Sequence, residues 1–146
     1  MKKAIITIVL AVFFFSSYSN AAGIEKQIQD KSSAVSSEKE LFVLLTNGDK
    51  EVLTKMVAPY LNVAAKSWEK RTLLIWGPSE KTIAENPDLK ELIAKLKDGG
   101  VILKACKWCA EQYMVGDVLS SLGFEVAYMG TPLTEALQSN MKVMIF

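Results

Sequence analysis

Residues 101–110 read Val-Ile-Leu-Lys-Ala-Cys-Lys-Trp-Cys-Ala, an apolar run that passes directly into a Cys-x-x-Cys motif. The run predicts a buried strand, and the helical spacing of the apolar residues that follow predicts a helix. Cys106 is therefore expected at the C-terminal end of a strand and at or just before the N-terminus of a helix. Backbone N–H groups and the helix dipole favour a thiolate there, and Lys104 and Lys107 add positive charge nearby. If the protein carries out chemistry, we expect Cys106 to perform it.

The same alternation of strand and helix signals continues on both sides of this junction. Apolar runs predict strands over residues 41–45, 71–76, 101–105, 124–129 and 142–146. Apolar residues at helical spacing predict a helix between each strand and the next, for example where Asn86 offers a cap and Pro87 takes the first helical position. Five strands alternating with four helices, joined by short turns, are typical of an α/β fold with a mostly parallel sheet covered on both faces.

The N-terminal region has the pattern of a secretory signal peptide. Residues 1–22 contain a pair of lysines, an uninterrupted apolar run over residues 4–15 and small residues near the predicted cleavage site. The apolar run is too short to span a bilayer, which takes about 20 apolar residues, and no later segment qualifies. We therefore expect a periplasmic or secreted protein with no stable membrane span after cleavage. Residues 23–40 are predicted to form a polar linker or a short helix, and residues 41–146 the α/β domain.

The composition argues against several classes of function. Removing residues 1–22 takes away two lysines, so the formal net charge changes from +1 to −1, and no basic stripe is present to bind nucleic acid. Histidine is absent, which removes Ser-His-Asp and Cys-His catalysis of the usual kind. Two cysteines supply only half of a zinc site, so no metal is expected. The sequence has no glycine-rich motif for dinucleotides or phosphates, so no cofactor is expected either.

The loops at the carboxyl ends of the predicted strands are the expected place for a ligand, as in other open α/β sheets. Cys106 lies in one of these loops. The residues that we expect to share its rim are Asn47, Gly48, Gly77 and Gly130.

Cys106 and Cys109 are the two cysteines of the chain, and their spacing allows two interpretations. A helix-start cysteine with a partner one turn later can cycle between dithiol and disulfide, with Cys106 as the attacking thiolate and Cys109 as the resolving thiol. Lys107 would favour the thiolate, and Trp108, expected to be at least half exposed, would help to shape the contact with a partner. Alternatively, the pair forms an inert disulfide or two buried thiols. A thioredoxin fold is not expected, because the motif follows the third of five predicted strands and Pro132 precedes a helix.

Several segments resemble the DsrE/DsrF-like family of small α/β sulfur-handling proteins. The matching stretches are Asn86-Pro87-Asp-Leu89, Gly100 to Cys106, Gly123-Phe-Glu-Val126 and Met129 to Thr134. The resemblance covers residues 41–146 and rests on the order and spacing of these stretches. It implies a flavodoxin-like, three-layer α/β/α fold that assembles into homo-oligomers. It also implies that a cysteine at the position of Cys106 carries a persulfide between partner proteins.

These patterns predict an exported DsrE-like protein that handles sulfur or thiols through Cys106 and Cys109, by persulfide transfer or by thiol–disulfide exchange. Its partners would be a sulfur donor or acceptor protein, or a small thiol. The alternative is a non-catalytic oligomeric binding module in which the Cys-x-x-Cys motif forms a structural disulfide.

Overall fold

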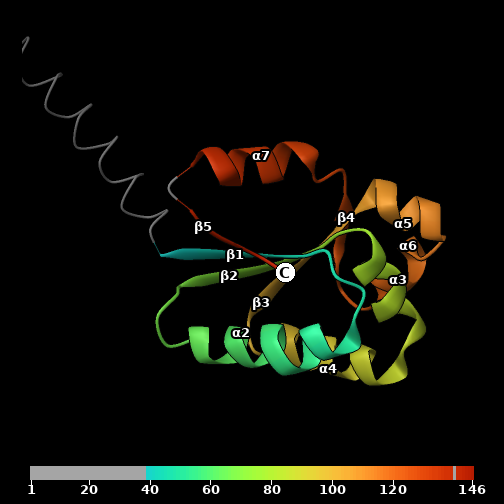
Figure 1. Ribbon diagram of the computed structural model, residues 1–146, viewed down its shortest axis with the longest axis horizontal. Coiled ribbons are helices and arrows are strands. Elements are labelled where there is room, and N and C mark those ends of the chain that lie inside the picture. The colour runs from blue at the N-terminus through green and yellow to red at the C-terminus, as the bar shows by residue number, and fades with distance from the viewer. Residues whose placement is uncertain (1–38, 140) are drawn as a thin grey trace, which may run out of the picture. The chain divides into compact units, whose positions relative to one another are not determined.

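The computed structural model describes residues 39–139 and 141–146, so the predicted signal peptide and residues 23–38 of the predicted linker lie outside the described residues. Five strands form one sheet in the order β4-β3-β2-β1-β5, and every neighbouring pair runs parallel (Figure 1). The strands are β1 (Glu40–Leu45), β2 (Lys70–Ile75), β3 (Val101–Cys106), β4 (Glu125–Ala127) and β5 (Lys142–Ile145). The predicted parallel five-stranded sheet is confirmed, and its first strand begins at Glu40, within the segment predicted as linker.

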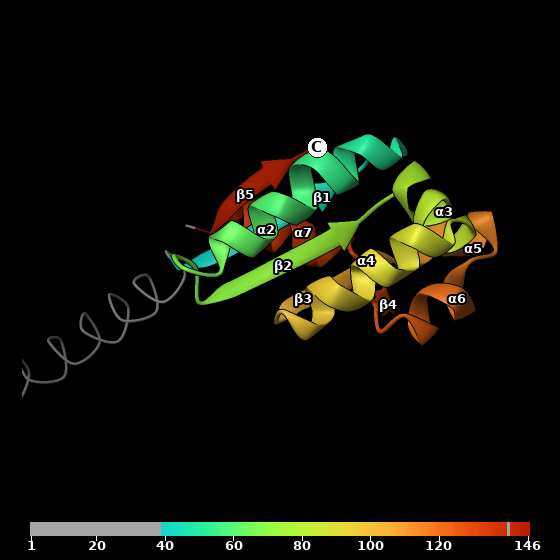
Figure 2. The same cartoon turned by 90° about the horizontal axis from the view of Figure 1, so that it is seen from below.

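Helices connect the strands and cover both faces of the sheet. They are the π-helical segment η1 (Val52–Val57) and α2 (Ala58–Ala64) after β1, α3 (Pro78–Glu85) and α4 (Pro87–Asp98) after β2, α5 (Lys107–Tyr113) and α6 (Gly116–Ser121) after β3, and α7 (Gly130–Gln138) after β4. Figure 1 shows α7 on one face of the sheet and α2 and α4 on the other, and Figure 2 shows α2 and α4 from their own side. These are the three layers of a flavodoxin-like α/β/α fold. Within residues 39–139 and 141–146, no helix is long and apolar enough to cross a membrane.

The order of the strands determines where a crevice opens. From β1 to β4 the chain steps across the sheet in one direction, and the right-handed rule for parallel strands then favours connecting helices on one face, where α2 and α4 lie. The return from β4 to β5, which lies beside β1, passes through α7 on the other face. The loops after β3 and β4 therefore leave towards opposite faces, which is the arrangement that opens a ligand site in α/β sheets. The order differs from the 2-1-3-4-5 order of flavodoxin itself, although the layers are the same.

Buried side chains form two clusters, one on each face of the sheet. Alternation along β1 divides its apolar run, so that Val43 packs in the larger cluster with residues of α2 and α4, and Leu44 packs in the smaller cluster with residues of α7. The buried residues of the smaller cluster are Phe42, Leu44, Leu74, Cys106, Cys109, Met129 and Ala136. Both cysteines therefore belong to the apolar layer between the sheet and α7.

Some local predictions are wrong. The sequence predicts one helix between the second and third strands, but α3 precedes α4, because Pro78 starts a helix directly after Gly77. Asn86 does not cap α4 with its side chain, since its Nδ2 donates to the Thr82 carbonyl oxygen at 2.7 Å. The single helix predicted after the cysteines is divided, because Met114 adopts a left-handed conformation with φ of 56° and ends α5. β4 is shorter than predicted.

Candidate functional site

The junction predicted from sequence lies at the carboxyl edge of the sheet. Cys106 is the last residue of β3 and, in an extended conformation, the residue that precedes α5. It lines a pocket of about 360 Å³ at the ends of β3 and β4. The other lining residues are Trp76, Trp108, Tyr128, Met129, Gly130 and Thr131. The predicted position of Cys106, at a strand end and a helix start, is confirmed.

Aromatic side chains form much of the pocket wall. Trp108 is 59% exposed, as expected, and Tyr128 is 61% exposed, whereas Met129 is buried. The Lys107 Nζ lies 5.2 Å from the centroid of the Tyr128 ring, a cation–π contact at the rim. The pocket is therefore a largely apolar recess with a cation at its edge and a thiol on its wall.

The two lysines expected to add positive charge near Cys106 both have acidic partners. The Lys107 Nζ lies 3.8 Å from Glu111 Oε1, and the Lys104 Nζ lies 2.6 Å from Glu125 Oε2 on the neighbouring strand. Both charges are shared with carboxylates, and the expected effect of Lys107 on the Cys106 thiol stays a prediction.

Both cysteines are free thiols and both are almost buried, with Cys106 3% and Cys109 4% exposed. Cys106 lines the pocket, whereas Cys109 lies in the first turn of α5, beside the backbone of Gly77, with its sulfur atom within 4.8 Å of the Cys106 sulfur. Burial raises the pKa of the Cys109 thiol to about 11. Cys109 is therefore the protonated thiol of the pair near neutral pH, and Cys106 is the thiol that borders the pocket.

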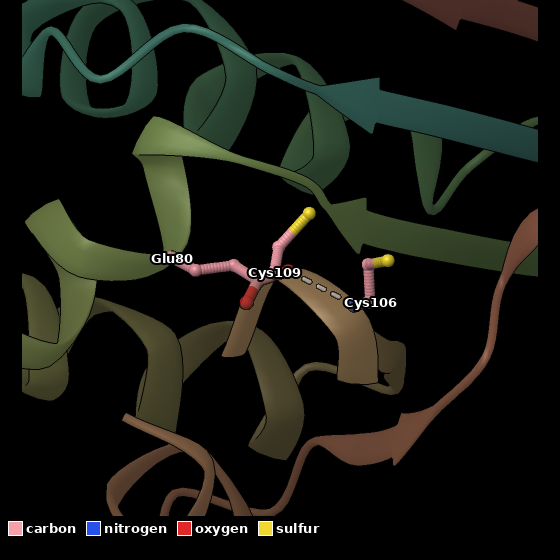
Figure 3. Close-up of side chains that lie close together, drawn as sticks. All are labelled: Glu80, Cys106 and Cys109. Atoms are coloured by element: carbon pink, nitrogen blue, oxygen red, sulfur yellow. Dashed lines mark hydrogen bonds between the residues drawn. The ribbon is translucent and has the colours of Figure 1, made fainter. Parts of the chain in front are cut away.

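Glu80 of α3 is a third member of the site that the sequence interpretation missed. Its side chain is fully buried, and its Oε1 accepts a hydrogen bond from the Cys106 backbone N–H at 3.0 Å (Figure 3). Its Oε2 has no hydrogen-bond partner among the described residues. Burial raises the pKa of this carboxyl from 4.5 to about 7, so that its protonated and ionised forms coexist near neutral pH.

The sequence signal for Glu80 is the proline two residues before it. If Gly77-Pro78 only ends a strand, Glu80 is expected in a surface loop. If Pro78 instead occupies the first position of a helix, Glu80 lies in the first turn of that helix, as the structure has it. That helix starts beside Cys106, because β2 and β3 are neighbours in the sheet.

Glu80, Cys106 and Cys109 offer one carboxylate oxygen and two sulfur atoms, all within 4.8 Å of one another. Carboxylate and thiolate groups are both ligands that zinc binds in proteins. The sequence-based expectation of no metal counted only cysteine and histidine as ligands, and the buried carboxylate adds a third donor.

The structure brings two of the four predicted rim residues to the site. Gly77 contacts Cys109 through its backbone, and Gly130 lines the pocket. Gly48 instead packs against α3, where an added Cβ would approach Pro78 Cβ to 3.0 Å. Asn47, beside Gly48, is exposed and accepts a hydrogen bond from the Asp49 N–H at 2.8 Å. Both follow β1, which β2 separates from β3.

No protein-family model and no curated protein matches the chain. Among solved structures, it is similar to a conserved protein of unknown function from Bacteroides thetaiotaomicron, with 30% sequence identity and a TM-score of 0.74. The match covers 77% of this chain and 99% of that chain. The similarity therefore extends over the whole Bacteroides chain.

Proposed function

The chain belongs to the same family as this conserved Bacteroides protein of unknown function, and we propose that its site performs thiol–disulfide exchange or sulfane-sulfur transfer. Cys106 is the attacking thiol and Cys109 the resolving thiol. The observation that supports this assignment is that Cys106 lines a pocket at the edge of the sheet, whereas its neighbour Cys109 is not among the residues that line that pocket. The two cysteines thus have different access to a reactant, as the two steps of exchange require.

In the exchange reaction, the Cys106 thiolate attacks one sulfur of a substrate disulfide. A bond forms between these two sulfur atoms, and the other half of the substrate leaves as a thiolate. The Cys109 thiol then loses its proton, and its sulfur attacks the Cys106 sulfur. This step forms the internal disulfide and releases the second substrate thiolate, so that two electrons pass from the dithiol to the substrate.

Sulfane-sulfur transfer begins at the same atom. The Cys106 thiolate takes the outer sulfur of a donor persulfide and releases the donor as a thiolate. Attack of Cys109 on the Cys106 sulfur would then release hydrogen sulfide and leave the internal disulfide. A persulfide on Cys106 therefore persists only while Cys109 does not react, which makes the behaviour of Cys109 decisive for any relay.

The proposal includes a relationship to the DsrE/DsrF-like family, export from the cytoplasm and assembly into a homo-oligomer. Its support is the matching stretches of sequence, the signal-like pattern of residues 1–22 and a flavodoxin-like fold with a cysteine at a strand-to-helix junction. A compartment outside the cytoplasm is oxidising, so a dithiol produced there by the reverse exchange, in which the internal disulfide oxidises a substrate dithiol, can be returned to its disulfide form.

The test is to trap the first intermediate. Reduced protein is mixed with a small aromatic disulfide in the presence of a chelator, and adducts are identified by mass spectrometry. Cys109→Ser should accumulate a mixed disulfide on Cys106, the wild type should proceed to the internal disulfide, and Cys106→Ser should form neither. With a persulfide donor, Cys109→Ser should gain one sulfur atom on Cys106. A wild type that reacts no faster than Cys106→Ser would refute the proposed function.

The near-complete burial of both cysteines favours a second candidate, a non-catalytic binding module with a structural role for the pair. In that case Cys106→Ser should lower the melting temperature or disrupt assembly, and the wild type should show no exchange activity to lose. Melting temperatures and exchange rates measured on the same samples separate the two functions.

A further inference from the structure

We propose that Glu80, Cys106 and Cys109, with both thiols reduced, form a binding site for a thiophilic divalent cation such as Zn²⁺. The three side chains come from α3, the end of β3 and the first turn of α5, and their ligand atoms lie within 4.8 Å of one another. All three residues are buried, so bulk water competes poorly for a bound cation. The inference goes beyond the proposed function, because it requires no exchange chemistry.

The unpaired oxygen of Glu80 is the observation that points to a ligand. Its Oε1 accepts the Cys106 N–H, whereas its Oε2 is buried and has no hydrogen-bond partner in the described part of the chain. A buried polar atom without a partner costs about 1–3 kcal/mol, and native proteins rarely leave one unpaired without a water, an ion or a functional reason. A cation bound by the Glu80 carboxyl group and the two sulfur atoms provides this buried group with a partner.

The arrangement suits a tetrahedral ion. Zinc–sulfur distances of about 2.3 Å and zinc–oxygen distances of about 2.0–2.2 Å place neighbouring donors of one ion roughly 3.5–3.8 Å apart. The three donors are within 4.8 Å of one another, so modest side-chain rotations bring them into this range. Three protein ligands leave a fourth coordination position for water or a small ligand. Because Cys106 also lines the pocket, a molecule in the pocket lies beside one of the three ligands.

The donor set selects the class of cation. Sulfur ligands favour Zn²⁺ and similar ions, whereas Mg²⁺ and Ca²⁺ take oxygen ligands. The cysteines bind metal as thiolates, so a Cys106–Cys109 disulfide would remove two of the three ligands. Oxidation and metal binding therefore exclude each other, and a bound cation protects the reduced pair from oxidation.

Cobalt(II) is the probe for this site, because Co²⁺ occupies tetrahedral zinc sites and thiolate ligands give it a charge-transfer absorption. Reduced protein is stripped with a chelator, exchanged into chelator-free buffer and titrated with Co²⁺ without oxygen. We expect the absorption to saturate at one Co²⁺ per chain and to disappear when Zn²⁺ is added. Oxidised protein and the double variant Cys106→Ser/Cys109→Ser should show no such absorption. Reduced wild type without a saturable charge-transfer band would overturn the proposal.

Glu80→Gln distinguishes the three-ligand site from a simple pair of cysteines. This variant keeps the volume of the side chain and both thiols, and we expect its Co²⁺ affinity to fall by at least about tenfold. Glu85→Gln is the matched control, because Glu85 is exposed on the same helix and should leave affinity unchanged. Equal affinity of Glu80→Gln and the wild type would overturn the assignment of Glu80. Exchange is assayed with chelator present, so the failure of metal binding and the failure of the proposed function are separate results.

Discussion

Glu80 makes the stability of the fold depend on pH, and the substitution Glu80→Gln should remove that dependence. The side chain is 0% exposed, and burial raises its pKa from 4.5 to about 7 because the charged form is poorly solvated. An acid whose pKa is raised by folding stabilises the folded state in its protonated form. That stability is fully present below pH 4.5 and is lost as the pH rises through about 7.

The size of the effect follows from the shift. A shift of roughly 2.5 pH units at about 1.36 kcal/mol per unit corresponds to about 3 kcal/mol. Glutamine is close in volume to glutamate and is neutral, and its side-chain oxygen can still accept the Cys106 N–H. Glu80→Gln should therefore be more stable than the wild type by about 3 kcal/mol near pH 8.5, and almost as stable as the wild type near pH 4.5.

Urea unfolding of reduced, chelator-treated protein at about pH 5 and about pH 8.5 measures this difference, since the free energy of unfolding is read from the midpoint and slope. Glu85→Gln, on the exposed side of the same helix, is the control and should show no pH-dependent gap. A gap between Glu80→Gln and the wild type that is the same at both pH values would refute the reasoning. So would a variant less stable than the wild type at the higher pH.

Three further predictions concern the backbone, the pocket wall and the N-terminal region. Gly77→Ala should lower the free energy of unfolding by about 1–3 kcal/mol, because Gly77 has φ of +68° and ψ of −132°, whereas Gly130→Ala should be nearly neutral. An added Cβ would have no atom within 4 Å at either position, so a lower urea midpoint for Gly77→Ala than for Gly130→Ala would report backbone strain at Gly77. Equal midpoints for the two variants would contradict this explanation. Trp108→Ala should slow exchange with an aromatic disulfide by about two- to tenfold while leaving the melting temperature unchanged, and a drop in melting temperature would assign Trp108 to the core instead. Protein recovered from an exporting host should begin near Gly23 by N-terminal sequencing, and an intact Met1 would contradict the signal peptide.

The strands were predictable because their local pattern reflects their surroundings. β1 lies between two helical layers, and such a strand needs apolar residues on both faces, which appears in sequence as a continuous apolar run. The same logic located Cys106, because an apolar run followed at once by helical spacing leaves little room for a loop. The order of the strands and helices, and the position of Cys106 among them, could therefore be predicted from the amino-acid sequence.

The remainder of the site depends on contacts between segments that local patterns do not encode. The strand order places the ends of β2 and β4 beside Cys106 and keeps Asn47 and Gly48 two strands away. Glu80 became part of the site only because α3 starts at Pro78 and buries its first turn against the neighbouring strand end. A glutamate in a first helical turn is ordinarily a surface residue that favours the helix dipole, so nothing local marks this one as buried.

The depth of Cys106 has a consequence for which molecules it can react with. Its sulfur is almost shielded from solvent, and the recess in front of it is bordered by Trp108 and Tyr128. A small disulfide fits such a recess, whereas the broad face of a folded protein stops at the two rings. A protein that exchanges sulfur with this chain must present its own reactive group on a narrow, protruding segment. Under the proposed function, the width of the recess therefore selects the reactant before any bond forms.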